Sequence, residues 1–102
     1  MIPTISRPLF VRRQVSYWAE FDAQVVILDG AANSIRDQLP NDIPQQIRYI
    51  HQPIKFNQRL SHAKEFVKTE FVCLLPDDEF FVPQGLSRAI KYLRDDSELI
   101  GR

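Results

Sequence analysis

The sequence predicts an α/β fold in which a mostly parallel sheet carries helices on both faces. Two apolar runs, at residues 25–28 (VVIL) and 71–75 (FVCLL), have the composition of short strands that are buried on both faces, and residues 47–50 form a third strand. Between these runs, apolar residues recur every three or four positions, which is the pattern of amphipathic helices. Strands that alternate with helices favour parallel pairing through right-handed crossovers.

The first two elements are short. Residues 1–6 hold a fragment of a first strand at most, because Pro3 interrupts the run and a buried strand normally has more apolar residues. A helix over residues 8–20 follows, with Pro8 in its first turn and an apolar stripe that includes Trp18. The position of Trp18 on this stripe favours a core role over a sugar-stacking surface.

The later elements follow from the same two patterns. After the strand at residues 25–28, we predict a short helix that ends at Leu39, a helix over residues 55–68, a last helix over residues 83–95 and the start of a further strand at residues 98–102. The architecture is therefore Rossmann-like, with an incomplete sheet. In the common strand order 3-2-1-4, the strand at residues 71–75 lies beside the first strand, and the crevice between the two is where ligands bind.

Composition excludes several classes of protein. The 102 residues are 44% apolar, and their 13 basic and 13 acidic side chains cancel, so the chain has no electrostatic footprint for nucleic acid or for an anionic membrane surface. No stretch approaches the roughly 20 apolar residues of a membrane span, and no signal peptide is visible, so we expect a cytoplasmic location. The single cysteine, Cys73, rules out an internal disulfide and is expected to be a small buried residue.

Three consecutive carboxylates follow the strand at residues 71–75, after Pro76. Asp77, Asp78 and Glu79 repel one another, and a hard divalent cation with oxygen ligands would offset that cost. A solvated acidic loop is the alternative, since polar residues collect in loops. The strand order decides between them, because it sets the acidic turn opposite Thr4 and Arg7 at the switch point of the sheet.

Several motifs, taken in chain order, resemble those of family 2-like glycosyltransferases. PTISRP at residues 3–8 resembles the P-T-x-N-R turn after the first strand of that family, and VVILDG at residues 25–30 resembles its V-V-D-D-G-S segment. Arg59, followed by FVCLLPDDE at residues 71–79, is similar to its R-N and Y-I-x-F-L-D-x-D-D motifs. The resemblance covers essentially the whole chain and implies the GT-A fold, with a nucleotide-diphospho-sugar as donor.

The resemblance also implies roles for individual residues. Thr4 and Arg7 would lie near the nucleotide base. Asp29 would accept hydrogen bonds from the base or the ribose, and Arg59 would approach the base or a phosphate.

The acidic turn departs from the family pattern at one position. Pro76 stands where the family has the first aspartate of its D-x-D motif, so Asp77 would contact the ribose through a one-residue shift. Asp78 and Glu79 would hold Mn²⁺ or Mg²⁺. Such an ion would bridge the two phosphates and stabilise the charge that develops on the leaving group.

The resemblance assigns no catalytic residue to this chain. In that family, the catalytic base belongs to an acceptor-binding half, which would follow residue 102. We therefore interpret residues 1–102 as one incomplete nucleotide-sugar-binding domain, to be completed by a C-terminal half or by a second chain. Two alternatives stay open: a small non-catalytic α/β domain that binds nucleotides or regulates, and a structural remnant that binds nothing.

Overall fold

The protein has a parallel three-stranded sheet at its centre, as the alternation of strands and helices predicts. The computed structural model describes residues 1–69, 71–80 and 83–95. Strands β1 (Ile2–Thr4), β2 (Val25–Asp29) and β3 (Ile47–His51) pair in the order β1-β2-β3, and both pairings are parallel. The α/β class and the parallel sheet are therefore confirmed.

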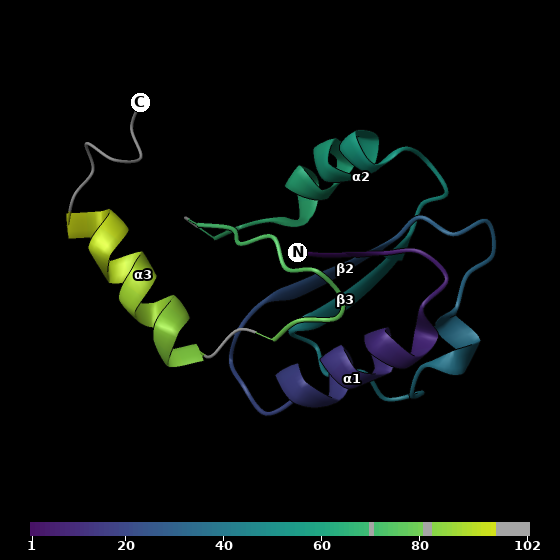
Figure 1. Cartoon of the computed structure of the whole chain (residues 1–102), viewed down its shortest axis with the longest axis horizontal. Helices are drawn as coiled ribbons and strands as arrows, with labels where there is room; N and C mark the ends of the chain where they lie inside the picture. Colours follow the sequence, from purple (N-terminus) through teal and green to yellow (C-terminus); the bar gives the residue numbers. More distant parts are fainter. Residues whose placement is uncertain (70, 81–82, 96–102) are drawn as a thin grey trace.

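Helices cover both faces of this sheet (Figure 1). Helix α1 (Pro8–Trp18) packs against the face that carries Ile27, and helix α2 (Phe56–Ala63) packs against the opposite face, which carries Leu28. Because β2 lies between two strands and two helices, all five of its residues are buried. Trp18 is only 3% exposed and belongs to the core, as predicted.

The other helical segments are shorter than expected or lie at the periphery. The short helix predicted to end at Leu39 is a single 3₁₀ turn, η1 (Arg36–Gln38). The helix predicted over residues 55–68 is regular only as far as Ala63, where α2 ends, and a second 3₁₀ turn, η2 (Lys64–Phe66), follows it. Helix α3 (Pro83–Asp95) has the predicted bounds but extends away from the sheet (Figure 1). The strand start predicted at residues 98–102 lies outside the described residues.

The predicted fourth strand, at residues 71–75, is wrong. This segment runs beside β1, where the amide of Leu75 donates to the carbonyl of Met1 at 2.9 Å and the Met1 amino group donates to the carbonyl of Cys73 at 2.8 Å. It does not continue the β ladder, and Val72 and Leu74 are 45% and 48% exposed. Cys73 is exposed as well, so its predicted buried role is also wrong. Only Leu75 joins the core, at 3% exposure, because neither face of the segment is fully covered.

Among the described residues, no helix is long and apolar enough to cross a membrane. Helix α3, the longest of the helices described, has 13 residues, well below the roughly 20 that a membrane span requires.

Candidate functional site

The predicted site residues come together at the carboxyl edge of the sheet. Thr4 ends β1 and Asp29 ends β2, and the acidic turn follows the segment that lies beside β1. Parallel strands end at the same edge of a sheet, and residues 71–75 run beside β1 to that edge, so residues from distant parts of the sequence meet there. Thr4, Asp29 and Asp77 are all at least 95% buried, so this edge holds closely packed polar side chains.

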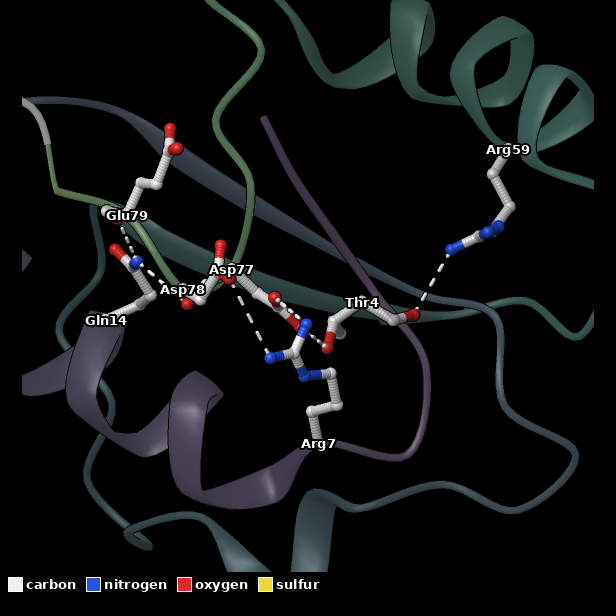
Figure 2. Close-up of polar contacts among 7 residues, drawn as sticks. All are labelled: Thr4, Arg7, Gln14, Arg59, Asp77, Asp78 and Glu79. Atoms are coloured by element: carbon white, nitrogen blue, oxygen red, sulfur yellow. Dashed lines mark hydrogen bonds and ion pairs between the residues drawn. The ribbon is translucent and has the colours of Figure 1, made fainter.

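Asp77 contacts two of the predicted site residues. Thr4 donates from Oγ1 to Asp77 Oδ2 at 2.8 Å, and Arg7 donates from Nη1 to Asp77 Oδ1 at 2.9 Å (Figure 2). Ser6 adopts a positive φ of 53°, a left-handed conformation that is uncommon outside glycine, in the turn that leads into α1. The expected meeting of Thr4 and Arg7 with the acidic turn is confirmed.

Asp78 and Glu79 face outward instead. The Asp78 side chain is 50% exposed and lies 3.9 Å from Arg7 Nη2, and the Glu79 side chain points away from Asp77 (Figure 2). Within residues 1–69, 71–80 and 83–95, no three His, Cys, Asp or Glu side chains are grouped so that they could hold a metal ion. The predicted metal ligands Asp78 and Glu79 are therefore not part of a complete cage of protein ligands in the described part of the chain.

Helix α1 anchors the acidic turn through a residue that the sequence analysis missed. Gln14 is fully buried, and its Nε2 donates to the backbone carbonyls of Asp77, at 3.1 Å, and Glu79. The ring of Phe80 also packs on that of Tyr17, with centroids 4.8 Å apart. The available signal was the position of Gln14 on the apolar stripe of the helix, where a polar side chain needs hydrogen-bond partners.

Asp29 is engaged inside the protein. Its Oδ1 accepts the amide of Ala31 at 2.9 Å, and its Oδ2 accepts a short hydrogen bond from the hydroxyl of Tyr49. Burial raises the pKa of Tyr49 above its usual value, and the hydrogen bond to Asp29 raises it further. Asp29 has no exposed surface, so the predicted contact with a base or ribose requires this pair to open.

Arg59 lies under the ends of β1 and β2. It is 4% exposed, and its Nη1 donates to the carbonyls of Leu28, at 2.9 Å, and Thr4, at 3.3 Å, whereas its buried Nε has no hydrogen-bond partner among the described residues. Gly30 is next to it: a Cβ at that position would lie 2.5 Å from Arg59 Cζ. The close packing explains why a glycine follows β2.

Thr4 contacts both the acidic turn and Arg59. Its hydroxyl donates to Asp77 while its carbonyl accepts from Arg59, so one residue joins the acidic turn to the buried guanidinium (Figure 2).

Comparison of the chain with protein-family models, with curated proteins and with solved structures finds no match. Function is therefore inferred from the chemistry of this edge.

Proposed function

We propose that the carboxyl edge of β1 and β2 binds a nucleotide-diphospho-sugar, as the donor-binding part of a glycosyltransferase with a GT-A fold. The observation that supports the proposal is the contact between Thr4 and Asp77, which are 73 positions apart in the sequence. This contact unites the PTISRP and PDDE motifs in one site, and these motifs carry the family resemblance. The site lies at a sheet edge of the kind where α/β proteins bind nucleotides.

The charges at this edge suit a diphosphate together with a cation. The Arg7 side chain is 42% exposed and forms an ion pair with Asp77, so a phosphate would share the guanidinium with this carboxylate. Asp78 lies beside it and faces solvent. We assign Asp78 and Glu79 as ligands of Mn²⁺ or Mg²⁺, because such an ion needs only one or two protein carboxylates when phosphate oxygens and waters complete its shell. The ion would supply Lewis-acid stabilisation of the leaving diphosphate.

The two buried site residues, Asp29 and Arg59, contribute only if the site opens enough to expose them to the ligand. A ribose hydroxyl that binds Asp29 replaces the hydroxyl of Tyr49, and a phosphate or base that binds Arg59 can pair with its Nε, which has no partner within the described part of the chain. Thr4 and Asp77 are already paired with each other, so in this proposal they shape the site near the base and the ribose.

A non-catalytic nucleotide-binding domain is the second candidate. It is favoured by the inward orientation of Asp77, which removes one carboxylate of the acidic turn from the solvent-facing surface. This candidate predicts nucleotide binding that does not depend on a divalent cation.

Calorimetric titration of the chain with UDP and GDP, with and without Mn²⁺, tests both candidates. We expect Mn²⁺ to tighten nucleotide binding by about tenfold, which corresponds to about 1.4 kcal/mol. Asp78→Asn should abolish this gain, whereas Asp22→Asn, a control that changes an exposed carboxylate before β2, should preserve it.

The other possible outcomes distinguish between the two candidate functions or contradict both. Binding that is independent of Mn²⁺ would support the non-catalytic domain, and no binding at millimolar nucleotide would contradict both candidates. Release of nucleoside diphosphate from a nucleotide sugar, rising with acceptor concentration, would identify a transferase rather than a binding domain.

A further inference from the structure

Gln14 links the acidic turn to the only tryptophan of the chain. Trp18 donates from its indole Nε1 to Gln14 Oε1 at 3.0 Å, one helical turn along α1. An indole N–H can only donate, so the amide oxygen of Gln14 must face Trp18. The amide nitrogen then faces the acidic turn, and the orientation of the side chain is determined by chemistry alone.

The amide of Gln14 has no hydrogen-bonding capacity left on its nitrogen. Its two N–H bonds are directed at the carbonyls of Asp77 and Glu79, which flank Asp78 on both sides. The turn adds one bond of its own, from the amide of Glu79 to the carbonyl of Pro76 at 3.2 Å. Gln14 therefore holds the backbone on either side of the one residue whose carboxylate faces both solvent and Arg7.

We propose that Gln14 is a positioning residue for the donor site, which keeps Asp78 directed toward the ligand and transmits changes in the acidic turn to Trp18. The planar amide of Gln14 couples the acidic turn to Trp18, because a shift of the Asp77 or Glu79 carbonyl reorients the amide oxygen that accepts the indole N–H. The identity of the ligand rests on the proposed function, but the connection between turn, amide and indole does not.

Two substitutions of Gln14 distinguish its bonds to the acidic turn from its bond to Trp18. Gln14→Met keeps an unbranched side chain and loses both the bonds to the turn and the bond to Trp18. Gln14→Glu retains an acceptor for the indole but has no N–H groups for the two carbonyls. Gln58→Met makes the same change as the first variant at an exposed position of α2 and serves as the matched control.

The single indole N–H resonance of Trp18 and the backbone heteronuclear NOE of Asp78 are the direct measurements. In the wild type, addition of Mg²⁺ and UDP should shift the indole resonance. Both Gln14 variants should lower the NOE of Asp78 and weaken Mg²⁺-dependent UDP binding by about tenfold or more. In the ligand-free protein, only Gln14→Met should move the chemical shift of the Trp18 indole proton to that of an N–H without a hydrogen bond.

These measurements distinguish the inference from the function on which it rests. If the wild type binds no nucleotide, the proposed function fails, and the NOE of Asp78 in the ligand-free variants still tests the positioning role. An unchanged NOE in folded Gln14 variants, or a Gln58→Met control that behaves as they do, overturns the proposal. If neither Gln14 variant folds, the wild type decides, because nucleotide binding that leaves the indole resonance unmoved contradicts the transmission to Trp18.

Discussion

Residues 25–28 and residues 71–75 are similar apolar runs with different structures. The first forms most of β2, where Ile27 and Leu28 are at most 1% exposed. The second lies beside β1 without forming a strand, and Leu74 is 48% exposed. An apolar run therefore indicates that a segment can enter a sheet, whereas neighbours on both edges and both faces decide whether it becomes a buried strand.

The positions of the helices explain the difference. Helices α1 and α2 cover the two faces of β2, and strands β1 and β3 occupy its two edges. Helix α3 lies to one side of the sheet (Figure 1) and covers residues 71–75 only in part: Arg94 lies over the ring of Phe71 at 5.9 Å, but Leu74 stays 48% exposed.

The largest expected effect comes from the centre of β2. Ile27→Ala should reduce the free energy of unfolding by about 2–5 kcal/mol, because it removes a fully buried side chain from a position that cannot collapse. Urea denaturation followed by Trp18 fluorescence measures this change. A loss below about 1 kcal/mol would show that β2 is not the centre of the core.

Leu75→Ala tests the one residue of the segment at 71–75 that joins the core. Leu75 is 3% exposed and packs in the cluster with Ile2 and Ile27, so we expect a loss of about 2 kcal/mol, at the lower end for buried leucines since the edge can relax. The same urea denaturation measures it. A loss as large as that of Ile27→Ala would make the two segments equivalent in energy, despite their different exposure.

The hydrogen bond between the buried Asp29 of β2 and the partly buried Tyr49 of β3 predicts a dependence of stability on alkaline pH. The pKa of Tyr49 is raised by burial and by its bond to Asp29, so the folded state keeps this proton at a pH where the unfolded state has lost it. The contribution of Tyr49 is therefore complete below about pH 10 and is lost as pH rises through its raised pKa.

Urea denaturation at about pH 9 and about pH 11 should thus show a smaller alkaline loss of stability in Tyr49→Phe than in the wild type. Tyr92→Phe, at an exposed position of α3, is the matched control and should keep the alkaline loss of the wild type. Equal pH dependence in all three proteins would show that the Tyr49–Asp29 pair does not govern this behaviour.

Leu74→Ala is expected to have the smallest effect. The side chain is half-exposed, so its truncation should change the free energy of unfolding by no more than about 0.5 kcal/mol. Comparison with Leu75→Ala isolates burial, because both substitutions remove the same atoms from neighbouring positions. A loss above about 2 kcal/mol would restore the original prediction of a strand buried on both faces.

The amino-acid sequence determined the helices and the strand that have a clear local pattern of apolar residues. Helix α1, strand β2 and helix α3 were predicted within two residues of their observed bounds, because apolar periodicity is a property of neighbouring positions. The meeting of Thr4 and Arg7 with Asp77 was predictable too, since residues 71–75 run beside β1 and reach the same edge of the sheet even though they form no strand.

Only the tertiary structure decided which of these groups face solvent. It turned Asp77 inward and Asp78 outward, paired Asp29 with Tyr49, and placed Gln14 under the acidic turn. Each of these contacts joins segments that are far apart in the chain, so no local pattern contains it. Burial is set by what packs above a residue, and for residues 71–75 that covering depends on α3, which the sequence alone does not place.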